Sequence, residues 1–406
     1  MHSCNLCGSH NLTPLINFGS HPISHHFLKN PNLVEDQYDI DLQFCEECGL
    51  TQIVEPVDPK KFYTQLFALS SWKNQPHIPH EVELIRNLPN ISENSQIVEI
   101  ASNDGTFCRA LLDAGFHRTV GIEPAKDAQV IAREKRGVNT IGAFFNVETA
   151  KKIVDTYGRA DIVVARQVLE HISDLKEIQR ALKIILAPGG YLFLEVPDFS
   201  SWLHTFDYTI WEEHVNQFTP DTLKVFTDGI GIEIIHSESI VYSGESFLII
   251  GINSGKTSSL SKLYLPELRK ANILYKDAWP ALSRELKEYL GNHKRNGGRI
   301  GIYGAGSRVC ALVNYIGLGS YIDCFVDDQM EKQGLYMPGS HLPIFPSTHL
   351  YTAGITLCLL AVNTENEDKV IAKHVAWMKD GGRFYSIYPP SQRLLPVWEK
   401  FLHGPE

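Results

Sequence analysis

The sequence contains no hydrophobic run long enough to cross a membrane and no excess of basic residues. No segment reaches the roughly 18 to 20 uncharged apolar residues that a membrane-spanning helix needs, and residues 1–4 do not resemble a secretory signal. The formal net charge is −10 at pH 7, which argues against nucleic acid or an anionic membrane surface as a general partner. We therefore expect a cytoplasmic protein that binds neither nucleic acid nor membranes.

Cysteine is also scarce, and only half of the eight cysteines form a pattern. Two Cys-x-x-Cys pairs, each followed by glycine, contain Cys4, Cys7, Cys45 and Cys48. Each pair brings two thiolates to one tetrahedral metal ion, and zinc is the metal that this ligand set favours. Four protein ligands leave no coordination position open, so we expect the zinc to be structural. The alternatives are disulfides, which a reducing cytosol disfavours, or unpaired buried thiols.

The order of elements predicts a mostly parallel sheet. With 406 residues, 43% of them hydrophobic, the chain is long enough for two or three domains. After a helix predicted over 81–88, strands and helices alternate, which is typical of a parallel sheet covered by helices on both faces. The predicted strands are 96–100, 119–122, a short one near Thr140, 160–164 and 191–196, and the predicted helices are 106–114, 126–135, 147–157 and 175–186, with a turn at 187–190.

A candidate cofactor site begins at the first of these strands. Val98 to Phe107 is an apolar strand, a glycine-containing turn and the start of a helix, and Glu123 ends the next strand, where an acid can accept hydrogen bonds from ribose hydroxyls. The turn lacks the Gly-x-Gly-x-x-Gly spacing of dinucleotide sites. We predict S-adenosylmethionine as the cofactor, with Glu99 and Asp104 at its amino-acid end and Glu123 at its ribose. The predicted cofactor-binding residues are Glu99, Ala101, Asn103, Asp104, Gly105, Glu123, Pro124, Arg166 and Gln167.

The alternative for this segment is an ordinary strand–helix–strand unit, in which Gly105 only turns the chain and Glu123 is a solvated acid. A motif match of this length does not exclude that interpretation.

A second strand-turn-helix pattern lies near the C-terminus. It follows a polar linker at 253–259 and a long amphipathic stretch at 260–294, which is either a packing helix between domains or a subunit contact. Gly304-x-Gly306 resembles a dinucleotide fingerprint, but Val309 occupies the third glycine position. We therefore predict a Rossmann-like domain that binds no cofactor of its own. The sequence leaves the oligomeric state open.

Together these patterns predict an α/β protein with three parts. We expect a small zinc-binding module over 1–75, a central class I methyltransferase domain with a Rossmann-like fold over 76–253, and a C-terminal Rossmann-like domain over 254–406.

Two histidines follow neighbouring strands on the cofactor side of the central sheet. His171 lies in Arg166-Gln-Val-Leu-Glu-His171, and His214 stands directly after Glu213. An imidazole that titrates near neutral pH, beside a carboxylate, is suited to general acid–base catalysis. The alternative for each histidine is a hydrogen-bonded structural residue.

The whole chain resembles the sugar C-methyltransferases that act on nucleotide-linked 4-keto deoxysugars. The order of the modules is more specific than any one motif. The resemblance rests on the four cysteines of the zinc module, Glu99 to Gly105, Gly121 to Ala125, Val168 to His171, Glu213-His214, Tyr303 to Gly306, Lys332 to Gly334, Pro338-Gly339 and Pro343-Ile344.

This resemblance implies C-methylation at C-3 of a nucleotide-diphosphate-linked 4-keto-6-deoxysugar. A base removes the proton beside the keto group, and the enolate attacks the methyl group of S-adenosylmethionine. Position by position, His214 matches the base, Glu213 its neighbour, and His171 a histidine near the keto group that donates to the enolate. Tyr63 lies in the region where the family contributes a further active-site tyrosine.

The sequence departs from the family at several positions. Trp211 stands where the family usually has a tyrosine, Gln167 replaces a common asparagine, and 244–247 replaces a glycine-rich stretch. The alternatives are therefore an O- or N-methyltransferase of another small metabolite, or a non-catalytic protein that binds a nucleotide sugar or a dinucleotide. A reductase that binds a nicotinamide cofactor at Gly304 and Gly306 is a further alternative, disfavoured by the missing third glycine.

Overall fold

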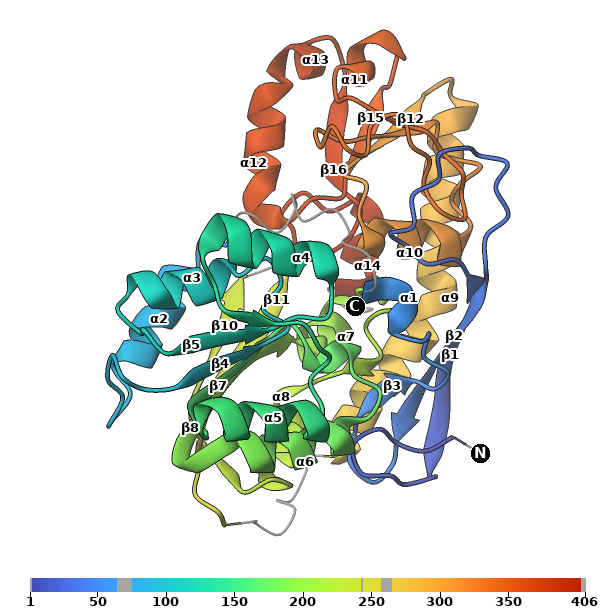
Figure 1. Cartoon of the computed structure of the whole chain (residues 1–406). Coiled ribbons are helices and arrows are strands. Elements are labelled where there is room, and N and C mark those ends of the chain that lie inside the picture. The colour runs from blue at the N-terminus through green and yellow to red at the C-terminus, as the bar shows by residue number, and fades with distance from the viewer. Residues whose placement is uncertain (1, 64–74, 242–243, 257–264, 403–406) are drawn as a thin grey trace.

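The computed structural model describes residues 2–63, 75–241, 244–256 and 265–402, and it contains three β-sheets (Figure 1). In Figure 1 the C-terminal domain lies at the top, the central sheet at the lower left, and the N-terminal strands along the right-hand side. The mixed α/β class predicted from the sequence is confirmed. Side chains in 64–74, part of the region in which the family tyrosine was sought, lie outside the described residues.

The N-terminal sheet combines strands from two distant parts of the chain. Its order is β1 (Leu12–His21), β2 (Tyr38–Cys45), β3 (Thr51–Ile53) and β9 (Asn216–Gln217). All three pairings are antiparallel, and β9 pairs with β3 through Thr51 opposite Gln217. The segment that immediately follows Glu213 and His214 is therefore part of the N-terminal sheet. The short helix α1 (Lys60–Tyr63) follows this sheet in the chain.

The central sheet has seven strands and a parallel core, as predicted. Its order is β10 (Ile232–Val241), β11 (Glu245–Asn253), β8 (Leu186–Pro197), β7 (Ala160–Arg166), β4 (Ile97–Ile100), β5 (Thr119–Ile122) and β6 (Thr140–Ile141). Strands β8 to β6 in this order run parallel, and the two pairings that involve β11 are antiparallel.

Helices cover both faces of the central sheet. They are α2 (Ile78–Arg86), α3 (Thr106–Asp113), α4 (Lys126–Val130), α5 (Val147–Tyr157), α6 (Leu175–Ile185), α7 (Phe199–Thr205) and α8 (Pro220–Asp228). Neighbouring residues of β4 belong to different hydrophobic clusters, Ile97 to one and Val98 to the other. Because successive side chains of a strand point to opposite faces, each face of the sheet has its own core.

Local sequence signals account for most of these bounds. In α6 the buried residues recur at helical spacing, and the Asp174 carboxylate caps the helix by accepting from the backbone N–H of Glu177 at 2.8 Å. The bounds of β5 and α5 coincide with the prediction. Two differ. The helix predicted over 126–135 continues beyond α4 as a π-helix (Ile131–Lys135), and β8 begins before the predicted turn.

The early start of β8 has a physical cause. Ala160 pairs with Leu186, but Ile162 already pairs with Tyr191, so the residues between Leu186 and Tyr191 bulge out of the ladder. Gly189 lies there with a φ of +74°, a conformation that glycine adopts without strain. The predicted turn at 187–190 is therefore a bulge within a longer strand.

The C-terminal domain contains a five-stranded parallel sheet behind one long helix. The helix is α9 (Leu265–Arg295), and the sheet order is β14 (Ile344–Phe345), β13 (Cys324–Val326), β12 (Ile300–Tyr303), β15 (Leu357–Leu360) and β16 (Arg383–Ser386). The other helices are α10 (Ser307–Ile316), α11 (His349–Thr352), α12 (Thr364–Lys373), α13 (Val375–Lys379), a 3₁₀ turn (Pro396–Trp398) and α14 (Glu399–Leu402).

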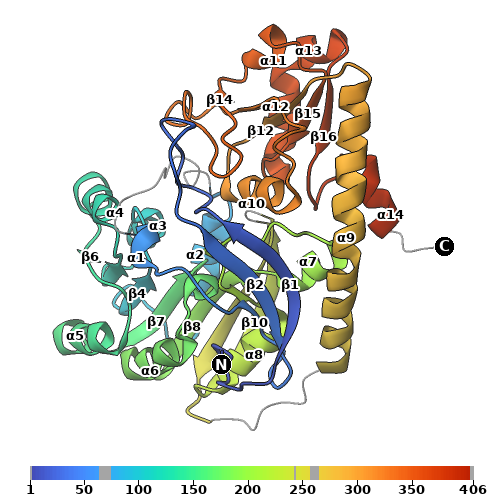
Figure 2. The ribbon, with the colours of Figure 1, turned by 90° about the vertical axis from the view of Figure 1, so that its right-hand side faces the viewer.

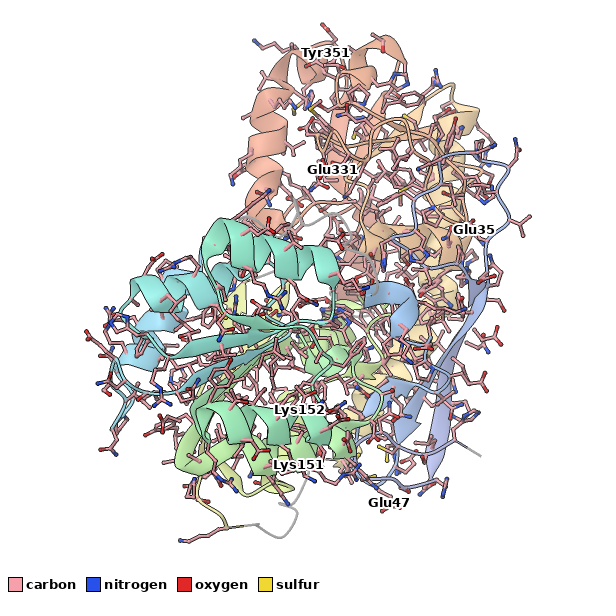
Figure 3. All side chains as sticks on the ribbon, in the orientation of Figure 1. Glu35, Glu47, Lys151, Lys152, Glu331 and Tyr351 are labelled. Carbon is pink, nitrogen blue, oxygen red and sulfur yellow. The ribbon has the colours of Figure 1, made fainter. Side chains whose placement is uncertain are left out.

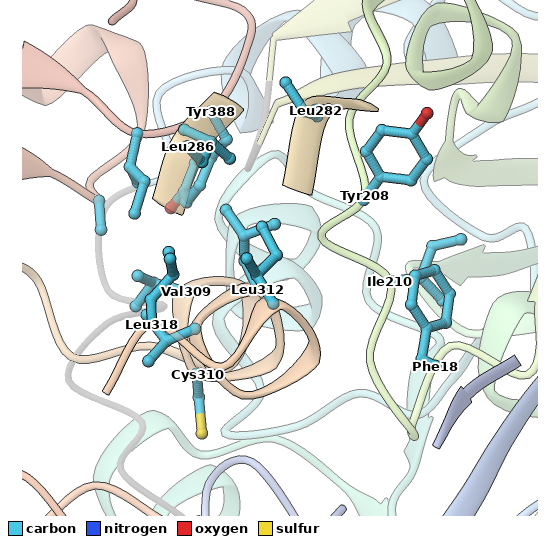
Figure 4. Close-up of a cluster of buried hydrophobic side chains, with 14 of the residues drawn as sticks. Phe18, Tyr208, Ile210, Leu282, Leu286, Val309, Cys310, Leu312, Leu318 and Tyr388 are labelled. Carbon is cyan, nitrogen blue, oxygen red and sulfur yellow. The ribbon is translucent and has the colours of Figure 1, made fainter. Parts of the chain in front are cut away.

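Helix α9 packs between the parts of the molecule. Figure 2 shows it running from the C-terminal sheet down past β1 and β2. Tyr275, Leu282 and Leu286 of α9 belong to one buried cluster together with Phe18 of β1 and Val309 of α10, and Figure 4 shows several of these side chains. Burial of this apolar area holds the domains together. The amphipathic stretch predicted over 260–294 is thus a packing helix, with 260–264 outside the described residues.

A loop after β1 also reaches the C-terminal domain. The Glu35 carboxylate, labelled in Figure 3, lies 2.7 Å from His341 Nε2 and accepts from the backbone N–H of Gly339 at 2.9 Å. Leu28 and Tyr336 form an isolated antiparallel bridge nearby. The N-terminal module is therefore fixed to both other domains. Among the described residues, none of the helices has the length and apolar character required to cross a membrane.

Candidate active site and zinc centre

The four paired cysteines converge on one point. Cys4 Sγ lies 3.5 Å from Cys48 Sγ, Cys7 Sγ lies 3.5 Å from Cys45 Sγ, and all four sulfurs lie within 4.8 Å of one another. Three are buried, Cys7 is half-buried, and none forms a disulfide. Four thiols at this spacing fit one tetrahedral zinc ion, with Zn–S bonds of about 2.3 Å and no position left for a substrate.

The zinc-binding knuckle contacts the segment that carries the catalytic candidates. Asn5, between Cys4 and Cys7, donates from its side chain to Asn216 Oδ1 at 2.9 Å, and the backbone N–H of Ile53 donates to Val215 O at 2.8 Å. The zinc centre is therefore mechanically connected to the residues just after His214.

The predicted cofactor turn has an unusual backbone. Ala101 and Asn103 adopt left-handed conformations with φ of +53° and +50°, and Gly105 has φ of +78°. Such conformations are uncommon for residues other than glycine and are concentrated at ligand sites. A Cβ at Gly105 would lie 3.0 Å from Ala132 Cβ, so glycine is needed for close packing as well as for its conformation. The Ser102 hydroxyl and Asn103 Oδ1 are buried without a hydrogen-bond partner among the described residues.

Glu123 ties this turn to the end of β5. Its carboxylate accepts from the backbone N–H of Asn103 at 2.9 Å and of Ala125 at 2.7 Å. It is 6% exposed, and burial raises its pKa while the two N–H groups oppose that shift. Among the described residues no cationic side chain forms an ion pair with Glu123. Glu123 and Pro124 both line the cavity described below, so the solvated-acid alternative is wrong for Glu123.

The two acids expected at the amino-acid end of the cofactor differ in their surroundings. Glu99 is buried and accepts a hydrogen bond from the Cys108 thiol at 2.9 Å, and burial raises its pKa to about 7. Asp104 is paired with Arg136 at 2.6 Å and accepts from the backbone N–H of Thr106 at 3.1 Å. Glu99 thus exchanges a proton near neutral pH, whereas Asp104 has a cationic partner.

Arg166 and Gln167 end β7 and belong to a buried polar network. Arg166 Nε lies 3.0 Å from Glu81 and 3.1 Å from Glu195, and its guanidinium carbon lies 4.4 Å from the centre of the Phe107 ring. Gln167, with φ of +52°, donates to Glu195 Oε1 at 2.8 Å. Both residues line the cavity, and the polar groups of both contact the Glu195 carboxylate.

The structure brings His171 and His214 together. Their rings meet edge to face with centroids 4.8 Å apart. His171 Nδ1 lies 2.9 Å from the carbonyl oxygen of Glu213, and because a carbonyl only accepts, that nitrogen carries a proton. His214 is 5% exposed. Burial, then the nearby His171 and Arg308, lower its pKa well below the ordinary value, so it is neutral at pH 7.

Glu213 stands beside His214 in the chain, and its carboxylate contacts a different histidine. Its Oε1 lies 2.5 Å from Nδ1 of His25 in the N-terminal module. Trp211, in place of the family tyrosine, packs on His214 with ring centroids 3.6 Å apart and offers no hydroxyl. Tyr63 is the last residue of α1, and its side chain lies outside the described residues.

The C-terminal glycine turn faces the same space. Gly304 has φ of +103°, and a Cβ there would lie 2.6 Å from Ala361 O. Asp327, after β13, accepts from the backbone N–H of Ala305 at 2.8 Å. Lys332 lies 3.5 Å from Asp327 and donates to Ala305 O at 2.7 Å. The turn precedes α10, whose first N–H groups can bind an anion.

One cavity of about 850 Å³ connects these features. It is lined by the cofactor turn, by His171, Glu213 and His214, by the C-terminal turn, and by His25 and Phe27 of the N-terminal module. A single ligand pocket typically has about 300 to 1,000 Å³. This cavity lies in the upper part of that range, and its lining comes from all three parts of the chain.

His25, Arg308 and Lys332 also line this cavity, and none of them was among the site residues predicted from the sequence. Arg308 is 8% exposed and is held by Asp207 and by the Thr209 hydroxyl at 2.8 Å. An arginine two residues after the glycine turn was the available signal for Arg308. For His25, which stands in a loop, no local pattern gave one.

Comparison with known families matches three successive parts of the chain. Residues 4–63 match the family described as "Putative zinc binding domain", residues 77–237 match "Methyltransferase domain", and residues 272–389 match "C-methyltransferase C-terminal domain".

Individual relatives cover the chain to different extents. The C-methyltransferase NovU of Streptomyces niveus is 26% identical over 95% of this chain and 95% of its own length. The ubiquinone biosynthesis O-methyltransferase of Bordetella avium is 24% identical over 34% of this chain and 53% of that protein. A solved S-adenosylmethionine-dependent methyltransferase from Anabaena variabilis has a TM-score of 0.36 and 19% identity, covering 45% of this chain and 86% of that one.

These three matches, in this order, support S-adenosylmethionine-dependent C-methyltransferase activity in a chain with an N-terminal zinc-binding domain. The residues fit both groups. The four cysteines supply a complete zinc ligand set, and the strained turn carries unpartnered polar atoms of Ser102 and Asn103 on the cavity wall.

Proposed function

We propose that the protein methylates C-3 of a nucleotide-diphosphate-linked 4-keto-6-deoxysugar through an enolate. The observation that supports this most directly is the shared cavity. The cofactor turn, the histidine pair and the N-terminus of α10 all face it, so a donor, a base and an anion-binding helix end surround one space.

The methyl donor has a cationic and a hydroxyl-bearing end that match the acids of the first turn. S-adenosylmethionine, when bound, supplies a methyl group on a sulfonium. Glu99 would hold its ammonium group, and Glu123 would accept from the ribose hydroxyls through oxygens that already accept from Asn103 and Ala125. Asn103, Gly105 and Ala101 would shape the backbone around it.

His214 is the proposed base. It is neutral at pH 7, which is the form that accepts a proton, and it lies on the cavity wall. His171 donates a hydrogen bond from Nδ1 to the Glu213 carbonyl, so in the neutral ring Nε2 is the acceptor. The expected donation from His171 to the enolate therefore requires its imidazolium form, which can arise by taking up a proton beside His214.

The diphosphate is proposed to lie at the C-terminal turn. The first N–H groups of α10 could bind an anion there, and Arg308 and Lys332 add positive charge on the cavity wall. Lys332 neutralises Asp327, and Lys373 pairs with Asp328 at 2.7 Å, so the two acids do not repel an anion. We also propose that the three domains divide near residues 75 and 253.

Incubation with a panel of nucleotide-linked 4-keto-6-deoxysugars in deuterated buffer, with and without S-adenosylmethionine, tests the proposal by mass. The expected result is deuterium uptake at carbon without the cofactor and a methyl gain with it. His214→Gln should lose both, with cofactor affinity unchanged, while His204→Gln, an exposed histidine of α7, should lose neither. Methyl transfer without deuterium uptake at carbon would instead indicate O- or N-methylation. The absence of both deuterium uptake and methyl gain with every sugar of the panel would contradict the sugar acceptor.

A further inference from the structure

The N-terminal module contacts the Glu212-Glu213 pair with two consecutive residues. The Glu212 carboxylate accepts from the backbone N–H of Ser24 at 2.6 Å and from its hydroxyl at 2.7 Å. The next residue, His25, reaches the next carboxylate, with Nδ1 of the ring 2.5 Å from Glu213 Oε1. Two adjacent acids of the catalytic segment are therefore matched, in order, by two adjacent residues of another domain.

The contact of His25 with Glu213 is largely shielded from water. The side chains are 9% and 13% exposed, and the Phe62 ring lies 5.8 Å from the His25 ring. A charge-assisted hydrogen bond in such surroundings is stronger than the same bond at the surface. His25 also lines the cavity beside Glu213, so the contact is at the site and not behind it.

Glu213 links this contact to the histidine pair. While its carboxylate binds His25, its backbone carbonyl fixes the proton on Nδ1 of His171, and the His171 ring meets that of His214. A residue whose side-chain carboxylate and backbone carbonyl both have partners has few conformations available to it. A shift of Glu213 would therefore change which nitrogen of His171 is protonated and how it faces His214.

We propose that His25 is a positioning residue for the methyl transfer, which acts by holding the Glu213 carboxylate and through it the His171–His214 pair. This inference rests on the proposed acid–base roles of those residues. It gives the zinc-binding module a part in the chemistry: the module supplies the polar partner of Glu213 in an active site where Trp211 offers no hydroxyl.

The electrostatics agree with the geometry. Burial lowers the pKa of His25, but the Glu213 carboxylate, with a smaller effect from Glu212, raises it above its ordinary value. Among the described residues, the neighbouring His26 and, through Glu213, His171 also interact electrostatically with His25. A raised pKa favours the imidazolium form of His25, the form that donates a charge-assisted hydrogen bond to the Glu213 side chain.

The kinetic test compares His25→Gln with His26→Gln, because His26 is the adjacent residue but is exposed. In His25→Gln we expect kcat to fall about 10- to 100-fold with the KM of the acceptor nearly unchanged, as for a misplaced catalytic group. His26→Gln should stay within about twofold of the parent. His25→Asn, whose side-chain nitrogen replaces Nδ1, should recover part of the loss, and the pH profile of kcat should shift in His25→Gln only.

A second measurement does not depend on finding the acceptor. Histidines labelled with ¹³C at Cε1 give one NMR titration per ring, and the His25 signal is assigned by its absence in His25→Asn. Glu213→Gln should lower the pKa of His25 below 6.5, because burial then acts without the carboxylate, whereas Glu47→Gln, at a distant exposed site, should not.

The outcomes separate the two proposals. A His25 pKa that does not change in Glu213→Gln, or equal kcat values for His25→Gln and His26→Gln, would overturn the positioning role. So would a loss of activity in His25→Gln that is accompanied by loss of zinc or of thermal stability and is not recovered in His25→Asn. A failure of every sugar in the panel, with the pKa change intact, would overturn the acceptor and leave the His25–Glu213 pairing established.

Discussion

The turn after β4 and the turn after β12 have the same construction but different charge. In each, the acid after the next strand accepts a hydrogen bond from a backbone N–H of the turn: Glu123 from Asn103 at 2.9 Å, and Asp327 from Ala305 at 2.8 Å. Asp327 has Lys332 at 3.5 Å, whereas among the described residues Glu123 has no cationic partner.

This difference determines what each turn can bind. An acid without a cation attracts hydroxyl and ammonium groups, so the first turn suits an aminoacyl nucleoside. An acid that is already neutralised leaves the positive helix end beside it to act on anions. The two proposed sites are therefore complementary in charge, and the presence or absence of a cationic neighbour of the acid is what distinguishes them.

The largest expected effect concerns the backbone of the second turn. Gly304→Ala should lower the free energy of unfolding by about 3 kcal/mol, because a Cβ would meet Ala361 O at 2.6 Å in a conformation that L-residues avoid. Gly306 has φ of −124°, and a Cβ added there would have no described heavy atom within 4 Å. Gly306→Ala should therefore change the free energy of unfolding by less than about 0.5 kcal/mol. Denaturant unfolding of both variants checks this, and equal losses would contradict the close approach of the turn to β15.

The next effect concerns the charge of the second turn. Lys332→Met leaves Asp327 buried and unpaired, which should raise the KM of the acceptor about 30-fold, corresponding to about 2 kcal/mol. Cofactor affinity should not change. Lys373→Met, which removes an exposed lysine from Asp328, is the control and should alter KM less than about threefold. A rise in the cofactor Kd in Lys332→Met would mean that the two turns are not independent sites.

The corresponding change in the first turn affects the other ligand. Glu123→Gln should raise the Kd of S-adenosylmethionine about tenfold, since a charge-assisted hydrogen bond contributes about 1.5 kcal/mol or more. Asp327→Asn should leave that Kd within about twofold. Titration calorimetry on both variants tests the assignment, and equal Kd values for parent and Glu123→Gln would remove Glu123 from the cofactor site.

The smallest effect is a pH dependence that only the first turn should show. Burial raises the pKa of Glu99 to about 7, so its carboxyl is mostly protonated at pH 6 and half ionised at pH 7. The ammonium group of the cofactor binds the ionised form, and affinity should therefore rise about fivefold between these two pH values. In Glu99→Gln this rise should be absent. A parent Kd that does not vary with pH would show that Glu99 does not hold the ammonium group.

The central sheet could be predicted because its signals are local. Fully buried strands such as β5 are continuous apolar runs, and amphipathic helices such as α5 repeat at a helical period, so both bounds were correct. The bulge in β8 was not predicted, because it is a register shift against the neighbouring strand β7, and the π-helix after α4 was not predicted either.

The site could be predicted only in parts. Strand ends identified the residues at the cofactor turn, since parallel strands end at one edge of the sheet. The partner of Glu213 could not be predicted, because His25 lies in a loop of another domain and becomes its neighbour only through tertiary packing. Likewise, nothing in Asn216–Gln217 indicated that these residues pair with β3.

That pairing has a consequence for how the protein is made. The ribosome completes β1, β2 and β3 long before it reaches β9, so the outer edge of β3 has no partner during synthesis of the central domain. A fragment that ends after the zinc-binding module keeps this open edge permanently and is an acceptor for any extended segment. Of two fragments divided within 64–74, the first would carry three strands of this sheet and the second would carry β9, so their reassembly would follow the rules of strand addition between chains rather than those of domain docking.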